Sequence, residues 1–265
     1  MILAIIQARM SSNRLPGKVM KEILGKPMIG HLLERLSLSK KIDKIVLATS
    51  DLAENDVLGC YVKKMGTDLY RGSEDDVLDR YYQVAKQYHP EGIVRITGDC
   101  PLIDPKVCDE VIKVFQKEKF DYVITGPTFA EGLDCEVFTL KALEKAWEEA
   151  KLKSEREHVT LYFHNNSDMF KILELHNQTN DSRYRFTVDE GVDFQVVTAI
   201  FEHFKQKGRP LFFADDIKDF LDANKNIFEL NANIIRNEGL IKSLKDDQKV
   251  ENKILINRFK DGEHR

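Results

Sequence analysis

Short runs of apolar and β-branched residues alternate along the chain with stretches that carry the helical repeat of apolar positions. The runs at 2–7, 44–49, 92–97 and 121–125 predict strands. The helical repeats predict helices at 28–38, 54–65, 74–88, 105–118 and 140–150, and two more that begin near residues 154 and 192. We therefore expect an α/β fold with a doubly wound, mostly parallel sheet and helices on both faces.

The pattern changes beyond about residue 210. Short, polar, Asn-rich segments at 216–224 and 231–244 predict a helical extension, and the chain from about residue 246 onward is highly charged. We expect such a tail to be only partly ordered when the chain is alone. The predicted organisation is a main domain at 1–210 and a helical C-terminal extension with a charged tail at 211–265.

Composition narrows the functional classes. With 265 residues, 42% of them hydrophobic, the chain can bury one substantial core. A net charge of -4 provides no broad basic surface, so extended nucleic-acid binding is disfavoured. The apolar stretch at 2–8 is too short to span a membrane, and the four scattered cysteines favour neither a disulfide framework nor a zinc site. We expect a cytoplasmic protein that makes no membrane contact.

The segment after the first predicted strand carries candidate chemistry. Three cations, Arg9, Arg14 and Lys18, lie among small residues in the sequence QARMSSNRLPGK at 7–18. Such a loop follows a strand at the edge where doubly wound sheets bind ligands, and its N–H groups and cations suit a triphosphate. It matches neither glycine-rich nucleotide fingerprint, and the alternative is a solvated basic turn.

A second candidate group follows the predicted strand at 92–97. Asp99, in the sequence TGDCPLID at 97–104, would lie near the cationic loop at the same sheet edge. A nucleoside triphosphate normally brings Mg²⁺, which takes one or two carboxylates besides phosphate oxygens and water. Asp99 is therefore the first candidate ligand for Mg²⁺, with an ordinary turn aspartate as the alternative. Asp104 suits the N-cap of the helix that starts at Pro105.

Several segments resemble a known family. The loop at 8–18, GKPMI at 25–29 and HLLER at 31–35 are similar to the cytidylyltransferases that include the 3-deoxy-manno-octulosonate (KDO) and acylneuraminate enzymes. RGS at 71–73, TGDCPL at 97–102 and EHVT at 157–160 resemble the branch of spore coat polysaccharide biosynthesis protein F. The resemblance spans roughly residues 1–245. It implies a fold like that of the nucleotide-diphospho-sugar transferases and a homodimer.

The resemblance also implies roles for individual residues. The CTP site would be lined by Ala8, Arg9, Ser11 and Ser12. Arg14 and Lys18 would bind the phosphates and act in catalysis with Asp99. Asp189 would be the second metal ligand, although its position also suits a helix N-cap.

Five further residues are candidates for the remaining contacts. Arg71 would hold the nucleotide or an acceptor carboxylate, or else form a surface salt bridge. Asp134 and Glu136 share one face of an apparent strand and would bind sugar hydroxyls, or else form its polar edge. Arg156 and His158 are candidate acceptor ligands, although an isolated histidine is more often a structural residue.

Helix caps account for other polar residues in these segments. Ser73 is the expected N-cap of the helix at 74–88, which makes the acids at 74–76 structural. Ser154 and Glu157 have the spacing of a capping box. Asp193 is expected to face solvent in the first turn of its helix.

Taken together, these residues predict a Mg²⁺-dependent enzyme that joins CMP from CTP to an acidic sugar, of nonulosonic or 3-deoxy-ulosonic acid type, and releases pyrophosphate. The product would serve surface polysaccharide biosynthesis. Three alternatives stay open: transfer of another nucleotide or transfer to a sugar phosphate, a metal-dependent glycosyltransferase, and a nucleotide-binding protein without turnover.

Overall fold

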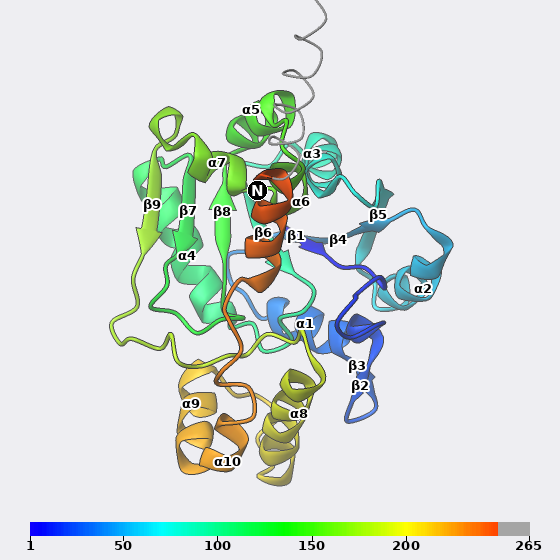
Figure 1. Ribbon diagram of the computed structural model, residues 1–265, viewed down its shortest axis with the longest axis vertical. Coiled ribbons are helices and arrows are strands. Elements are labelled where there is room, and N and C mark those ends of the chain that lie inside the picture. Colours follow the sequence, from blue (N-terminus) through cyan, green and yellow to red (C-terminus); the bar gives the residue numbers. More distant parts are fainter. Residues whose placement is uncertain (249–265) are drawn as a thin grey trace, which may run out of the picture.

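The computed structural model describes residues 1–248, and a twisted sheet forms its centre (Figure 1). Within this part of the chain the main sheet has seven strands in the order β5-β4-β1-β6-β8-β7-β9. β8 runs antiparallel to β6 and β7, and the other pairs are parallel. The strands are β1 (Ile2–Gln7), β4 (Lys44–Ser50), β5 (Asp68–Gly72), β6 (Gly92–Thr97), β7 (Tyr122–Thr125), β8 (Glu136–Phe138) and β9 (Ile172–Leu175). β2 (Glu22–Ile23) and β3 (Lys26–Pro27) form a separate small hairpin.

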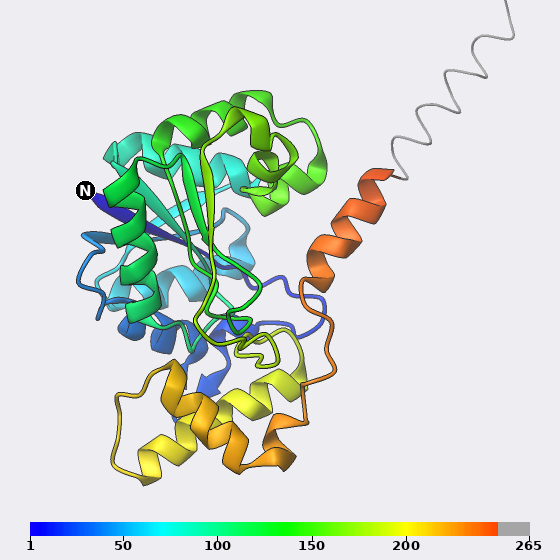
Figure 2. The ribbon, with the colours of Figure 1, turned by 90° about the vertical axis from the view of Figure 1, so that its left-hand side faces the viewer.

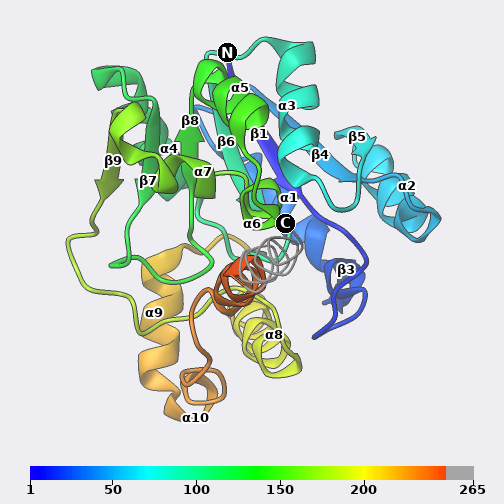
Figure 3. The ribbon, with the colours of Figure 1, turned by 45° about the horizontal axis from the view of Figure 1, so that its top comes forward.

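Helices cover both faces of the main sheet (Figure 3), which confirms the predicted doubly wound architecture. One face carries α1 (Met28–Leu36), α2 (Asp56–Lys64) and α4 (Pro105–Glu118). The other carries α3 (Val77–Tyr88), α5 (Leu140–Glu149), α6 (Lys153–His158) and α7 (Leu161–Asn165). The short 3-10 turns are η1 (Lys18–Met20), η2 (Ala53–Asn55) and η3 (Ser167–Met169). β1 is buried on both faces, as its uninterrupted apolar sequence predicts.

A third group of helices packs beyond the carboxyl ends of the strands (Figure 1). It consists of α8 (Gly191–Gln206), α9 (Ala214–Ala223) and α10 (Lys225–Phe228), which share one apolar core. This core joins residues on both sides of the boundary predicted near residue 210. Residues 238–248 form a further helix. Most of the charged tail predicted from about residue 246, namely residues 249–265, lies outside the described residues.

The predicted elements differ from the observed ones where strand pairing with distant residues or a helix cap determines the bounds of an element. β5 and β9 were absent from the expected strands. α3 begins at Val77 because the Asp76 side chain accepts the N–H of Asp79 at 2.8 Å, so Ser73 as its N-cap is wrong. The Ser73 hydroxyl instead accepts the N–H of Asp76 at 3.2 Å. The Asp104 cap is confirmed, because its carboxylate accepts the N–H of Lys106 at 2.9 Å.

The strand order determines where a ligand would bind. β4 and β5 extend the sheet to one side of β1, and β6 lies on the other side, so the winding direction reverses between β1 and β6. Ligands of open α/β sheets bind outside the carboxyl ends of the strands at such a point. The segments that follow β1 and β6 here are the cationic loop and the turn with Asp99.

Gly98 holds these two segments together. Its N–H donates to the carbonyl of Gln7 at 2.7 Å. A Cβ at this position would lie 2.6 Å from the Cβ of Ala8, closer than side chains approach one another. The absence of a side chain at Gly98 thus lets the turn after β6 contact the start of the cationic loop.

Candidate active site

The loop between β1 and η1 is folded back on itself by its own backbone. The N–H groups of Ser12 and Gly17 both donate to the carbonyl of Met10, at 2.9 and 3.1 Å. The side-chain oxygen of Asn55 accepts the N–H of Met10 at 2.8 Å. Gly17 adopts a φ of 66°, a left-handed conformation that glycine takes without strain. The chain is thereby turned so that Lys18 begins η1 beside the end of β6.

Lys18 joins three segments that are far apart in the sequence. Its ammonium donates to Asp99 and to Asp189, both at 2.9 Å, and to the carbonyl of Val188 at 2.8 Å. Its side chain is only 12% exposed. The structure therefore brings Lys18 of the loop together with Asp99 and Asp189, which were predicted separately.

Opposite charges stabilise one another in this cluster. Burial lowers the pKa of Lys18, but the carboxylates of Asp99 and Asp189 outweigh it and leave the pKa raised. Burial raises the pKa of Asp99, but the Lys18 ammonium and a hydrogen bond from Thr97 lower it to about 2. The ammonium and the Asp99 carboxylate are both charged at neutral pH.

Asp189 is positioned by a buried arginine. Arg185 donates to Asp189 and to Asp193 at 2.9 Å each, and it also pairs with Glu131. The Asp193 carboxylate accepts the backbone N–H groups of Asp189 and Glu190 at 2.9 Å each. Asp193 is fully buried, so the expectation that it faces solvent is wrong. Its burial follows from its pairing with Arg185.

Arg14 reaches the same cluster from the loop. It lies 3.0 Å from Asp189 and 2.5 Å from Glu238, at the start of the helix of residues 238–248. Asp189 thus contacts Arg14, Lys18 and Arg185. The hydroxyl of Ser12 accepts a backbone N–H within the loop and contacts none of these charged groups.

The first part of the loop meets a different carboxylate. Arg9 donates to Glu74 at 2.9 Å and lies 3.8 Å from Glu157, and the Ser11 hydroxyl also donates to Glu74. Glu74 precedes α3 and faces the loop, so its interpretation as part of a helix start is wrong. Ala8 is buried where the loop leaves β1.

Two of the predicted arginines are held by other parts of the chain. Arg71 donates to the carbonyls of Ser50 and Leu52 at 3.1 and 2.9 Å and pairs with Asp56. Arg156 donates to both carboxylate oxygens of Asp76. These contacts account for both arginines without a ligand, and their ligand-binding roles stay predictions.

Asp134 and Glu136 have unlike surroundings. β8 begins at Glu136, so Asp134 lies in the preceding loop, where it pairs with Arg236 at 2.8 Å. Glu136 is buried and pairs with Arg95 of β6. The two acids therefore do not form one strand face, and their binding of sugar hydroxyls stays a prediction.

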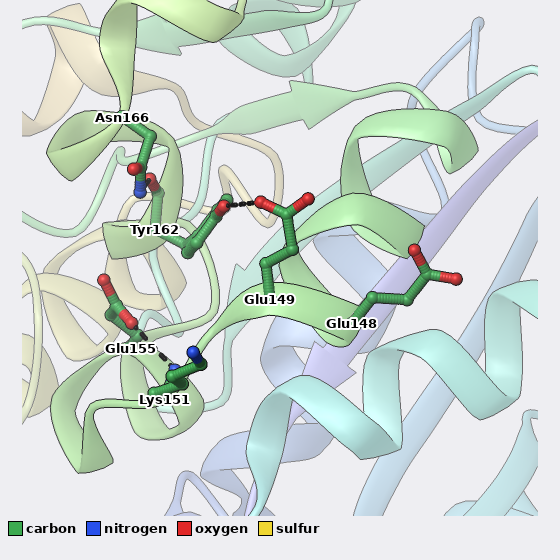
Figure 4. Close-up of a pocket in the computed structure, with 6 residues that line it drawn as sticks. All are labelled: Glu148, Glu149, Lys151, Glu155, Tyr162 and Asn166. Carbon is green, nitrogen blue, oxygen red and sulfur yellow. Dashed lines mark hydrogen bonds between the residues drawn. The ribbon is translucent and has the colours of Figure 1, made fainter.

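A depression between α5, α6 and α7 lies elsewhere on the molecule (Figure 4). There Glu155 accepts the N–H groups of Lys151 and Leu152 at 3.2 and 3.3 Å, which caps α6. The predicted capping box of Ser154 and Glu157 is therefore wrong. The acids that line this depression, Glu148, Glu149 and Glu155, do not suit a triphosphate.

His158 ends α6 on the side of the candidate site. Its Nε2 lies 3.0 Å from the hydroxyl of Ser243, in the helix of residues 238–248. Burial lowers the pKa of His158, and the nearby charge of Arg95 acts in the same direction. His158 is therefore neutral at pH 7 and available for hydrogen bonding.

Two kinds of feature are missing from the described residues. No helix among them is long and apolar enough to cross a membrane. Nor do residues 1–248 contain three or more histidine, cysteine, aspartate or glutamate side chains grouped as a metal cage.

A comparison with protein families shows to which family the chain belongs. The model of the cytidylyltransferase family matches residues 3–238. The chain belongs to the cytidylyltransferase family. It is 41% identical over 237 residues to an uncharacterized protein of Methanocaldococcus jannaschii, which covers 88% of this chain and 95% of that protein. It is 33% identical to spore coat polysaccharide biosynthesis protein SpsF of Bacillus subtilis, with 84% of this chain and 95% of that protein covered.

Other cytidylyltransferases match this chain in part or in structure. A KDO cytidylyltransferase of Geobacter sulfurreducens is 39% identical over 113 residues, which is 42% of this chain and 44% of that protein. The structure of a cytidylyltransferase from Leptospira borgpetersenii superposes with a TM-score of 0.81 and 35% identity. It covers 88% of this chain and 98% of the other. The family and the fold expected from the sequence are both confirmed.

The sequence did not lead us to expect Glu74 or Arg185 in the site of this cytidylyltransferase. Glu74 contacts Arg9 across 65 residues, and nothing local distinguishes it from the acids beside it. Arg185 did have a signal, because Arg185, Asp189 and Asp193 follow one another at intervals of four residues where a strand-like segment meets a helix. That spacing fits one arginine that serves two carboxylates.

We predict that Arg185→Met destabilises this cytidylyltransferase by about 3–5 kcal/mol, because it leaves the buried Asp193 carboxylate without its partner. Arg183→Met is the matched control two residues away. Arg183 is 52% exposed and pairs with Asp222 at the surface, so its loss should cost much less than that of Arg185. Urea unfolding of both variants measures the difference, and equal losses would contradict a buried ion cluster at Arg185.

Proposed function

We propose that this cytidylyltransferase activates an acidic sugar with CTP, giving a CMP-sugar and pyrophosphate for surface polysaccharide biosynthesis. The observation that carries the proposal is the convergence of Lys18, Asp99 and Asp189 beside the cationic loop, at the point where the sheet reverses its winding. Its relatives support the sugar class, since they include a KDO cytidylyltransferase and a spore coat polysaccharide protein. The acceptor would be of nonulosonic or 3-deoxy-ulosonic acid type.

The loop residues would bind the triphosphate. Arg14 and Lys18 contact phosphate oxygens in this proposal and neutralise the charge that develops on the leaving pyrophosphate. Arg9, Ser11 and Ser12 line the nucleotide along the rest of the loop. Arg14 and Lys18 are now held by carboxylates of the chain, so they are charged and already oriented towards the site.

The donor set at Asp99 and Asp189 fits Mg²⁺. Both carboxylates approach one ammonium at 2.9 Å, so two hard oxygen ligands already converge on a single positive group. The remaining positions of an octahedral shell would come from phosphate oxygens and water. When bound there, the ion supplies charge neutralisation at the α-phosphate and polarisation of the acceptor oxygen. Arg185 would hold Asp189 in place by donating to the second carboxylate oxygen of Asp189.

The reaction itself is an in-line displacement. An oxygen of the sugar forms a bond to the α-phosphorus while the bond to the pyrophosphate breaks, and no covalent intermediate with the chain is required. His158, at the end of α6, would contact the sugar. Formation of a homodimer stays a prediction.

The first test is a pyrophosphate-release assay that crosses four nucleoside triphosphates with a small set of sugar acids and sugar phosphates. We expect turnover with CTP and at least one sugar acid, and loss of this turnover when EDTA removes divalent ions. Preference for another nucleotide would contradict the proposed base. Full activity in EDTA would contradict the metal, and CTP binding without turnover of any acceptor would favour a non-catalytic protein.

We also predict that Asp99→Asn lowers kcat by about 100-fold or more while CTP still binds, because the change removes a charge from the proposed metal site. Asp168→Asn is the control, since it makes the same change on an exposed aspartate of η3. Its kcat should stay close to that of the wild type. Wild-type turnover and unchanged Mg²⁺ dependence in Asp99→Asn would show that Asp99 is an ordinary turn residue.

A further inference from the structure

An arginine beneath the loop has one nitrogen that the chain leaves unused. Arg95 in β6 donates from Nε to the side chain of Gln7 at 3.2 Å, and from Nη1 to Glu136. Its Nη2 makes no hydrogen bond with the described residues, and it is not among their fully buried unpaired atoms, so it reaches solvent. The side chain as a whole is 12% exposed. This solvent-facing nitrogen is therefore a donor that a ligand could use.

The surroundings fix the guanidinium at the site. Gln7 is the last residue of β1, directly before the cationic loop. Glu136 is held from its other side by the hydroxyl of Tyr122, which donates at 2.8 Å. Arg95 also lies close enough to His158 to influence its pKa. A guanidinium held from two sides thus lies between the last residue of β1 and His158.

We propose that Nη2 of Arg95 binds the carboxylate of the acceptor sugar and thereby selects acids over neutral sugars. This inference rests on the proposed function. In that proposal Arg14 and Lys18 bind phosphates and Arg9 lines the nucleotide. Arg156 donates to Asp76 and to the carbonyl of Trp147. Among the described residues, Arg95 is therefore a cation near His158 that keeps a free donor. Glu136 and Gln7 act as positioning residues that hold the guanidinium plane.

Arg95→Lys tests the assignment. Lysine keeps the charge opposite Glu136 but lacks the forked guanidinium, so we expect the KM for the sugar acid to rise about tenfold or more while the KM for CTP stays unchanged. Arg35→Lys is the control, because Arg35 is a buried arginine on the opposite face of the sheet. Its KM for the sugar acid should stay at the wild-type value. An unchanged KM in Arg95→Lys, or an equal rise for CTP, would overturn the inference.

A second measurement compares the sugar acid with its methyl ester. The methyl ester of the sugar acid should be a poorer acceptor than the acid for the wild-type enzyme, and Arg95→Lys should reduce the difference. Equal use of acid and ester by the wild type would overturn the role of Arg95 and leave CTP transfer intact. Failure of every acid and ester to release pyrophosphate with any nucleotide would instead contradict the proposed function itself.

The helix of residues 238–248 carries a second, independent inference. It begins where the match to the family model ends, and it lies next to α6 on the outside of the molecule (Figures 1 and 2). Glu238 pairs with Arg14 at 2.5 Å. The hydroxyl of Ser243 contacts His158 at 3.0 Å and donates to Glu157 at 3.1 Å. One short helix thus contacts both the loop and the proposed acceptor side.

We infer that this helix gates nucleotide binding, because the Glu238 carboxylate competes with phosphate oxygens for Arg14. The inference rests on Arg14 as a phosphate ligand. Binding of CTP would exchange one anion for another on the same guanidinium, and the contacts of Ser243 would keep the helix beside α6. The exposed pair of Arg14 and Glu238 is weak enough to be exchanged in this way.

Calorimetric titration of CTP into the full chain tests the gate. Glu238→Gln should lower the Kd for CTP about two- to fivefold, a change that corresponds to the free energy of one exposed ion pair. Glu229→Gln removes the same charge from an exposed side chain that has no partner among the described residues, and should leave the Kd unchanged. Equal Kd values for Glu238→Gln and the wild type would overturn the gate. Arg14→Gln tests the premise that Arg14 binds phosphate. Unchanged CTP affinity in this variant would contradict that premise.

Discussion

The ammonium of Lys18 is the interaction on which the geometry of the site depends. It connects the loop after β1, the turn after β6 and the segment before α8 through three hydrogen bonds of 2.8 to 2.9 Å. Neither aspartate would be stable as an isolated carboxylate in this half-buried position, and a buried lysine would lose its proton without them. Each charge therefore keeps the others ionised, and the central sheet and the helical group of α8 to α10 meet at this cluster.

The candidate site has two sides with different electrostatic character. Around Asp189 three cations surround the carboxylate, which suits the high negative charge of a triphosphate. On the side of α6, carboxylates such as Glu74, Glu157 and Glu136 balance the arginines. That side offers a mixture of donors and acceptors, as a hydroxylated acid needs. The loop from β1 spans both sides, so one segment contributes to both parts of the reaction.

Local signals were sufficient for the parts of the structure that depend on adjacent residues. The helix predicted at 105–118 has the observed bounds of α4, because Asp104 and Pro105 form its start within two residues. The apolar run at 2–7 likewise predicted β1 and, with it, the position of the loop. The proximity of the loop to Asp99 followed from the rule that parallel strands end at one edge.

Elements that depend on distant partners were not predictable in the same way. β9 is only half buried at the edge of the sheet, and its place there is set by pairing with β7. Asp193 has the position of an exposed residue in a first helical turn, but Arg185 draws it into the interior. Such contacts join residues that the hydrophobic pattern treats as unrelated, so the roles of the residues in them were assigned incorrectly or missed.

The tight contact at Gly98 has a consequence for motion in this enzyme. Because the turn after β6 and the beginning of the loop touch without an intervening side chain, the two segments can move only as one body. Adjustment to substrates would then come from the opposite side of the site, where Glu74, Glu157 and Glu238 contact the loop through the side chains of its arginines. The turn that carries the proposed metal ligand Asp99 is thus the fixed part of the site, and the carboxylates that contact the loop arginines form the part that can adjust.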